Sequence, residues 1–269
     1  MIKHYLKIAW RNLSRQKGLS FINIIGLSLG LACFSLFLLY AVNEFNFDRF
    51  HKNADNIYRV YRWTETMNGE EAGGDVYMPS PLGAAMKTDL PDVADFVRLS
   101  EGWGQSFVKV DGEVRRMNVS YADPSFFSVF TFPLKYGTAK EALKELQNIV
   151  ITRAKAKELF GTDNVVGRTI EIKIDESFVA FAVSAVAQNI PANSSIQFGL
   201  MGNFNFLETT SGAKRGINNW FRSAYQTYVQ LNPGSGLSND VQKLAAFHHK
   251  YYPTEEDELR KEGFKWEGE

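Results

Sequence analysis

Residues 21–40 read Phe-Ile-Asn-Ile-Ile-Gly-Leu-Ser-Leu-Gly-Leu-Ala-Cys-Phe-Ser-Leu-Phe-Leu-Leu-Tyr, and this stretch decides how the chain is organised. It lies within an uncharged run from Gly18 to Asn43. A helix of about 20 apolar residues crosses the roughly 30 Å hydrocarbon core of a bilayer. We therefore predict one transmembrane helix over residues 20–43. No other window of the sequence is long and apolar enough for a second.

The charges on the two sides of the span set its expected orientation. Residues 1–17 carry five basic residues and no acidic residue, whereas Glu44 and Asp48 follow the span. Basic residues next to a span favour the cytoplasmic side of the membrane. We expect a cytoplasmic N-terminus, with the chain outside the cytoplasm from about residue 44.

Two other interpretations of the span fit the sequence less well. A cleaved signal peptide has a shorter apolar region and small residues at its cleavage site. This span is longer, and residues 39–42 offer no Ala-x-Ala pattern. A lipoprotein signal needs a cysteine at the end of the apolar run, whereas Cys33 lies in its middle and reads as a small packing residue.

The first 17 residues have an amphipathic pattern of their own. The basic residues Lys3, Lys7, Arg11 and Arg15 recur every four positions, and apolar residues recur at helical spacing on another face. Trp10 suits the level of the lipid headgroups. We predict a cytoplasmic interfacial helix over residues 1–17 that contacts the lipid. The alternative is the plain charged flank of any signal anchor.

Two small residues in the span could serve helix packing. Gly26 and Gly30 form a G-x-x-x-G pair, which lets a second membrane helix approach closely. Such pairs are common by chance, so the pattern only suggests a neighbouring helix, in this chain or in a partner.

The remainder reads as a folded domain of mixed strands and helices. Hydrophobic residues make up 45% and charged residues 22% of the chain, which excludes a disordered protein. We predict an α+β fold over residues 44–253, followed by an acidic tail over 254–269. Two lobes are expected: residues 44–100 together with 165–253, and residues 101–164.

Local signals place several elements of this domain. A strand is predicted over 56–64, and Asp111-Gly112 predicts the turn of a hairpin. Asp123 before Pro124 has the pattern of a helix N-cap, and Ser238 is predicted to cap the last helix.

The sequence lacks the residue patterns of the common enzyme classes. It has no phosphate-binding G-x-x-x-x-G-K-[ST] loop and no G-x-S-x-G nucleophile motif. His248 and His249 are adjacent and would point apart on a helix, and His51 is interpreted as a surface residue. We therefore predict no catalytic residue, no metal site and no cofactor. Basic and acidic residues balance at 30 each, so we expect no nucleic-acid partner.

Several stretches together resemble a known family. They are Lys7–Leu13, Asn23–Leu31, Glu44–Val60, Tyr121–Phe127, Ala156–Gly161, Val166–Ile170 and Asn189–Ser194, in that order. Their sequences are similar to those of the permease subunits of MacB/FtsX-type ABC transporters. The resemblance covers residues 1 to about 250.

The resemblance implies a fold, a location and partners. It implies a two-lobed periplasmic core domain after the first membrane helix of a bacterial inner-membrane permease. It further implies a second permease copy, and a separate cytoplasmic ABC ATPase that binds the ATP. A periplasmic adaptor or an outer-membrane channel could join them. The expected work is the export of peptide, drug or lipoprotein-type substrates, driven by ATP hydrolysis in the partner, with no enzymatic activity in this chain.

One departure from the family keeps alternatives open. The family continues with further membrane helices, whereas this sequence shows one span before Glu269, as a truncated or shortened permease would. The substrate residues are unknown, because no family motif for them matches. The alternative function is a single-pass, membrane-anchored periplasmic binding or scaffolding protein that acts without transport; an anchored enzyme is the third possibility.

Overall fold

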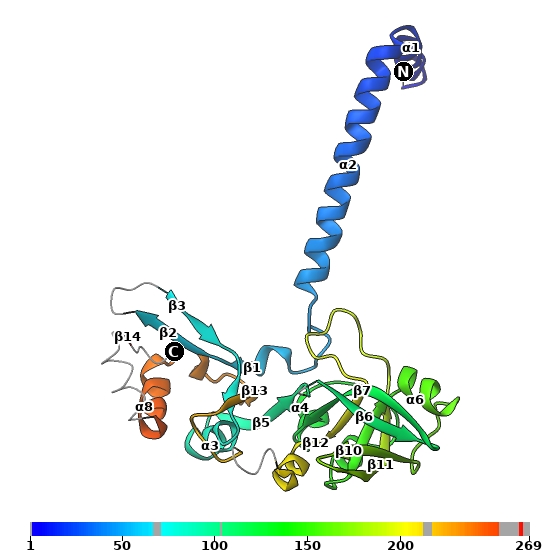
Figure 1. The fold of residues 1–269 in the computed structure, drawn as a ribbon. Helices are drawn as coiled ribbons and strands as arrows, with labels where there is room; N and C mark the ends of the chain where they lie inside the picture. Colours follow the sequence, from blue (N-terminus) through cyan, green and yellow to red (C-terminus); the bar gives the residue numbers. More distant parts are fainter. Residues whose placement is uncertain (1, 67–70, 103, 212–216, 253–263, 266–269) are drawn as a thin grey trace. The chain divides into compact units, whose positions relative to one another are not determined.

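The computed structural model describes residues 2–66, 71–102, 104–211, 217–252 and 264–265. The chain divides into two compact units, Met1–Asp48 and Arg49–Glu269. The first unit is helical and the second mixes strands with helices, as Figure 1 shows. The predicted α+β class is therefore confirmed, and the folded domain begins at about residue 49, close to the expected residue 44.

Two consecutive helices make up the first unit: α1 spans Ile2–Arg15 and α2 spans Lys17–Phe45. They are separated at Gln16, whose φ of −109° and ψ of 58° lie outside the helical region. α2 has 29 residues, and its most apolar window has a mean hydropathy of 2.2 with no part buried. It is the one candidate membrane span among the described residues, in agreement with the span predicted over 20–43.

Six strands in the described part of the second unit pair in a closed ring. The cyclic order is β7–β12–β9–β11–β10–β6 and back to β7. The bounds are β6 Gln105–Val110, β7 Glu113–Ala122, β9 Asn148–Thr152, β10 Thr169–Ile174, β11 Ser177–Ala187 and β12 Leu200–Asn203. β7 closes the ring because its first half pairs with β6 and its second half, Val119–Ala122, pairs with β12.

Alternate residues of these strands fill the ring with apolar side chains. Ile149, Ile151, Ile170, Ile172 and Phe181 are fully buried there. Residues of the opposite parity, such as Val150 and Met201, belong to a second cluster on the outer face. This outer cluster is covered by the short helices α4 (Phe126–Val129) and α5 (Ala139–Ala142). The remaining neighbours of the ring are β8 Leu134–Tyr136, α6 Arg153–Phe160 and η2 Phe204–Thr209.

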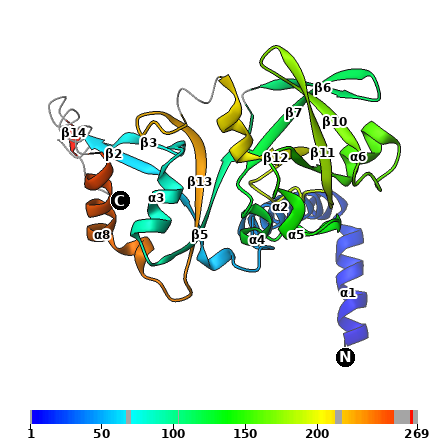
Figure 2. The same cartoon turned by 90° about the horizontal axis from the view of Figure 1, so that it is seen from below.

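The same sheet continues from β7 into an antiparallel portion at the other side of the domain, as Figure 2 shows. Its order is β7–β5–β13–β1, with the short β4 also paired to β13. Helices α3 and α8 pack on it through a third apolar cluster. The bounds are η1 Ala54–Asn56, β1 Ile57–Val60, β4 Met78–Pro79, α3 Leu82–Asp89, β5 Val93–Ser100, β13 Ser223–Leu231, η3 Leu237–Asn239 and α8 Val241–Tyr251. A separate small sheet joins β2 Arg62–Thr66, β3 Glu71–Asp75 and β14 Phe264–Lys265.

A buried ion pair joins the antiparallel portion to the ring. The Arg98 guanidinium donates to both Asp123 carboxylate oxygens, with Nη2–Oδ1 at 2.7 Å and Nε–Oδ2 at 2.9 Å. The Arg98 backbone N–H also donates to Asp123 Oδ2 at 2.7 Å. Arg98 lies in β5 and Asp123 directly follows β7, so the pair reinforces a junction at which only Leu99–Ala122 and Ser100–Tyr121 are paired.

Two further donors and the face of this guanidinium also have partners. Its Nη1 donates to Ser80 Oγ at 2.9 Å and its Nη2 to Asn205 Oδ1 at 3.0 Å. The Phe204 ring lies 4.1 Å below it. Asp123 is therefore not the predicted N-cap: its side chain pairs with Arg98, and Ser125 is the residue before α4. The long-range ion pair with Arg98 therefore replaces the helix cap that the local pattern predicted for Asp123.

Other local predictions have mixed outcomes. The hairpin at Asp111-Gly112 is confirmed, and both residues have positive φ. The N-cap of α8 is Asp240 rather than Ser238, since Asp240 Oδ1 accepts from Lys243 N–H at 3.0 Å. The strand predicted over 56–64 is two strands, because β1 and β2 join different sheets.

The predicted lobes differ from the observed strand pairing. β10 and β11 pair with β6 and β9, and β12 pairs with β7 and β9. Residues 169–203 therefore lie with 101–164 in the ring, although the sequence grouping placed them with 44–100. β13 does pair with β1 and β5, as that grouping expected. Of the acidic tail predicted over 254–269, residues 254–263 and 266–269 lie outside the described residues.

The ion pair gives the first testable prediction. Asp123→Ala leaves the Arg98 guanidinium buried without its carboxylate, and we expect it to lower the free energy of unfolding by about 3–5 kcal/mol. Glu158→Ala removes the exposed Lys155–Glu158 pair and should cost about 1 kcal/mol or less. Urea unfolding followed by circular dichroism measures both values. Equal costs for the two variants would refute the structural role of the ion pair.

Candidate functional site

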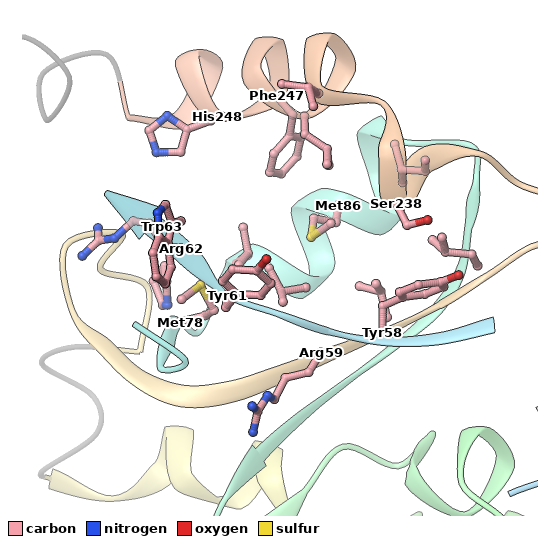
Figure 3. A pocket seen from close by; sticks show the side chains of 18 of the residues that line it. Tyr58, Arg59, Tyr61, Arg62, Trp63, Met78, Met86, Ser238, Phe247 and His248 are labelled. Carbon is pink, nitrogen blue, oxygen red and sulfur yellow. The ribbon is translucent and has the colours of Figure 1, made fainter. Parts of the chain in front are cut away.

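A pocket of about 390 Å³ lies in the antiparallel portion of the domain and is shown in Figure 3. Its walls come from β1 and the start of β2, from β4 and α3, from β13, and from η3 and α8. The volume is within the range of small-ligand sites in proteins, about 300–1,000 Å³. It therefore has the size to hold a small molecule or one chain of a larger one.

Helical periodicity explains why apolar side chains face this pocket. In α8, Val241, Leu244, Phe247 and His248 follow the spacing of one helix face, and all four line the pocket. Leu82 and Met86, one turn apart in α3, form the opposing wall. Met78, Leu82, Met86 and Phe247 are each less than a tenth exposed, so this wall belongs to the third apolar cluster.

The lining contains aromatic residues, thioethers and few charges. Tyr58, Tyr61, Trp63, Phe247 and Tyr252 supply aromatic surface. Uncharged polar groups of the lining come from Ser223, Ser238, Asn239 and the tyrosine hydroxyls, and its basic residues are Arg59, Arg62 and His248. No Asp or Glu is among these described lining residues. The pocket can thus hold apolar groups.

Two carboxylates hold α8 in place as a wall of this pocket. Asp89, at the end of α3, accepts from Lys250 Nζ at 2.5 Å and from Tyr251 Oη at 2.7 Å. Asp92 forms an ion pair with Lys243 and accepts from Ser235 Oγ at 2.8 Å. The hydrogen bond from Lys250 holds the pKa of Asp89 below its usual value, and Lys243 likewise lowers the pKa of Asp92.

A second feature of functional interest is the start of the domain, residues 50–52, which we name the domain anchor. Phe50 packs against the outer apolar cluster, 5.7 Å from Phe132 between ring centroids. His51 Nδ1 accepts from Thr131 N–H at 3.0 Å, and Lys52 N–H donates to Thr131 Oγ1 at 3.0 Å. The segment that follows α2 in the chain is thus fixed to the core of the domain.

His51 corrects a sequence-based interpretation. It was expected at the surface, but it is only 6% exposed, and its ring lies 5.0 Å from that of Phe132 and 5.2 Å from that of Phe130. The ring is buried because Thr131 supplies a backbone donor and the neighbouring phenylalanines supply apolar contacts. No local pattern at residues 50–53 predicts that His51 pairs with Thr131, 80 residues further along the chain.

The membrane residues predicted from the sequence stay outside the pocket. Lys7, Trp10, Arg11 and Arg15 are exposed on α1, with Trp10 76% exposed, and α1 is the helix that was predicted. The side chain of Lys3 lies outside what the structure describes. Contact of these residues with lipid stays a prediction.

The glycine pair is also open to a partner. A Cβ atom added at Gly26 or at Gly30 would meet nothing within 4 Å, so this face of α2 is uncovered in the chain. A role for the pair in packing against another helix stays a prediction.

Metal chemistry finds no support among the described residues. They contain no group of three or more His, Cys, Asp or Glu side chains that could hold a metal ion. His248 lines the pocket and stacks on Tyr252 at 4.6 Å between ring centroids, while His249 is exposed.

The sequence reasoning missed the pocket because its residues come from segments that are far apart in the chain. One local signal was available: Val241, Leu244, Phe247 and Tyr251 fall on one face of the last helix. That pattern shows that α8 packs on something, but it does not show that the packing is incomplete.

Comparisons with known proteins agree with this architecture. The family model for the MacB-like periplasmic core domain matches residues 20–246. No protein in the curated set matches the sequence.

Solved structures of similar shape are known. A domain of a protein from Porphyromonas gingivalis that is described as a permease aligns with a TM-score of 0.65 and 21% identity, covering 80% of this chain and 88% of that one. This similarity shows a shared fold.

Two further structures are less similar. The periplasmic region of MacB from Actinobacillus actinomycetemcomitans aligns at 12% identity with a TM-score of 0.47, over 80% of this chain and 91% of that one. The extracellular domain of the noncanonic ABC-type transporter YknZ from Gram-positive bacteria aligns at 14% identity with a TM-score of 0.42, over 77% of this chain and 98% of that one.

The attachment of α8 gives a prediction with a defined pH dependence. Because the pKa values of Asp89 and Asp92 are lowered in the fold, their stabilisation is complete above the ordinary value of 3.8 and is lost as the pH falls through the lowered values. At neutral pH, Asp89→Asn combined with Asp92→Asn should imitate that loss. We expect faster hydrogen exchange of residues 241–251 in this double variant.

Asp111→Asn is the matched control, since Asp111 pairs with Arg168 at the surface of the ring and has no contact with α8. It should leave the exchange of α8 unchanged. An unaltered exchange rate of α8 in the double variant would show that the two carboxylates do not hold the helix.

Proposed function

Because the chain belongs to the family of MacB-like periplasmic core domains, we propose that it acts as the periplasmic part of an ABC transporter permease. In this role it couples ATP hydrolysis by a cytoplasmic partner subunit to the export of peptide, drug or lipoprotein-type substrates. The observation that carries the proposal is the family match over residues 20–246, which begins inside the candidate membrane span.

The proposal gives each part of the chain a role. α2 anchors the protein in the inner membrane, with α1 on the cytoplasmic side and the domain in the periplasm. A cytoplasmic ABC ATPase binds the ATP, so this chain needs no catalytic residue and no cofactor of its own. A second permease copy completes the transporter, and an adaptor or an outer-membrane channel could continue the export path.

The domain anchor supports the mechanical part of the proposal. A movement of α2 reaches the domain through residues 46–49, which lead to the Phe50 and His51 side chains that pack in the domain. Two hydrogen bonds to Thr131 and the packing of Phe50 fix residues 50–52 to the domain, so this attachment begins five residues after the end of α2 at Phe45. In the proposed mechanism, a displacement of α2 is passed to the core of the domain through this short connection.

We predict that the anchor is needed for this coupling. In nanodiscs that contain the protein and its ATPase, nucleotide binding should alter the hydrogen exchange of domain residues 53–252. Phe50→Ala should abolish most of that response without lowering the rate of ATP hydrolysis, because the attachment loosens while the ATPase is untouched. Phe45→Ala is the matched control, since Phe45 is 75% exposed at the end of α2.

Two results would count against the proposal. An unchanged response in Phe50→Ala would remove the anchor from the mechanism. If the protein purified from its native membrane carries no ABC ATPase, the proposed role in transport is wrong. The single-pass binding or scaffolding role then takes its place.

The orientation is tested separately by cysteine labelling. In a Cys33→Ala background, Val166→Cys places a thiol on the domain and Arg15→Cys places one at the end of α1, both at exposed positions. A membrane-impermeant maleimide should label the first in intact spheroplasts and the second only after the membrane is opened. The reverse pattern would invert the proposed topology.

A further inference from the structure

We propose that the domain anchor is a mechanical clamp, which takes up the force that arrives from α2 and so protects the pairing of β1 with β13. The clamp rests on the proposed function, since it requires a membrane helix that moves. Its test contains no ATPase and no nucleotide. The clamp can therefore fail while transport holds, and transport can fail while the clamp holds.

The strand that follows the anchor in the chain, β1, is the element that needs this protection. Among the described strands it pairs only with β13. None of its four residues is fully buried: two are half-buried and two are exposed. Tyr58 and Val60 nevertheless line the pocket, so the loss of β1 from the sheet would remove a wall of that pocket.

Only a short turn separates the anchor from β1. In this turn, Ala54 N–H donates to the His51 carbonyl oxygen at 3.1 Å, and Asn56 N–H donates to that of Asn53 at 2.9 Å. β1 begins directly after Asn56. A force that arrives along the chain would therefore reach β1 at once if the contacts of the anchor were absent.

The anchor holds the domain at one residue, Thr131. The Thr131 N–H donates to His51 Nδ1, and the Thr131 Oγ1 accepts from Lys52 N–H, both at 3.0 Å. Because both bonds join neighbouring residues of the anchor to the same residue, a pull on the anchor loads them together. The His51 ring is buried, so water competes poorly for its bond. The packing of Phe50 against Phe132 adds to this attachment.

The segment that receives the force is fixed in the core. Phe130 and Phe132, on either side of Thr131, are both buried in the outer apolar cluster. Phe130 packs edge-on against Tyr228 of β13, with 5.2 Å between the ring centroids, and Phe132 stacks on Phe126 of α4 at 5.3 Å. Because this cluster is close-packed, the force reaches β13 and α4 without passing through β1.

The test is single-molecule stretching of the full chain in a nanodisc with magnetic tweezers. In a Cys33→Ala background, Glu44→Cys gives an attachment point at the end of α2 and Val166→Cys gives one on the ring, both at exposed positions. The lifetime of the folded chain at constant force is measured, together with the length that the first step releases. Release of residues 50–60 alone gains at most about 40 Å.

We expect His51→Phe to shorten this lifetime about tenfold, because it keeps an aromatic ring but removes the acceptor of one hydrogen bond. The first step should then release residues 50–60. His51→Asn should recover most of the lifetime, since its Oδ1 can accept the Thr131 N–H.

Ser184→Ala is the matched control. The Ser184 hydroxyl donates to the carbonyl oxygens of Ala142 and Ile149, which lie outside the anchor and β1. Its removal should lower the free energy of unfolding of the domain, but it should leave the lifetime and the length of the first step unchanged.

Two results would overturn the proposal. One is an equal lifetime in His51→Phe and in the unaltered protein. The other is an equal shortening in Ser184→Ala, because that would show a general loss of stability. If His51→Phe does not fold, Thr131→Val decides the matter, since it removes only the hydroxyl that accepts from Lys52 N–H. An unchanged lifetime in Thr131→Val would then contradict the clamp.

Discussion

The Arg98–Asp123 ion pair is the constraint on which the domain depends. It is formed where β5 meets the end of β7, a junction with only two paired residues on each strand. Removing two charges from water is costly, and this site offsets the cost with a bidentate bond and further partners for the guanidinium at Ser80 and Asn205. A ring of strands and an antiparallel sheet are thereby held as one body.

That junction also shows where sequence reasoning reaches its limit. Asp123-Pro124 has the local pattern of a helix start, and no nearby sequence feature predicts that Asp123 pairs with Arg98. A signal that acts within two residues was interpreted correctly at the Asp111-Gly112 turn. The grouping of β10 and β11 failed because β9 and β11 pair in parallel across a separation that no local pattern encodes.

The same contrast between local and long-range signals holds for the candidate membrane helix, for the domain anchor and for the pocket. The candidate membrane helix was predictable because 20 consecutive uncharged, mostly apolar residues are a signal in themselves. The burial of His51 was not, since it depends on Thr131 and on rings from a different part of the chain. The pocket was also out of reach, because a gap among apolar side chains is a property of packing, whereas periodicity reports only which side chains face inward.

The pairing of β1 with β13 has a mechanical consequence. These are the first and last strands of the central sheet along the chain, they are antiparallel, and Ile57 lies opposite Gln230. The chain therefore enters β1 and leaves β13 at the same end of the pair. Forces that pull these two points apart would break the hydrogen bonds one after another, like a zipper. A force that pulls both points in the same direction does not load these hydrogen bonds. The pair therefore withstands forces that move its two ends together and opens under forces that separate them.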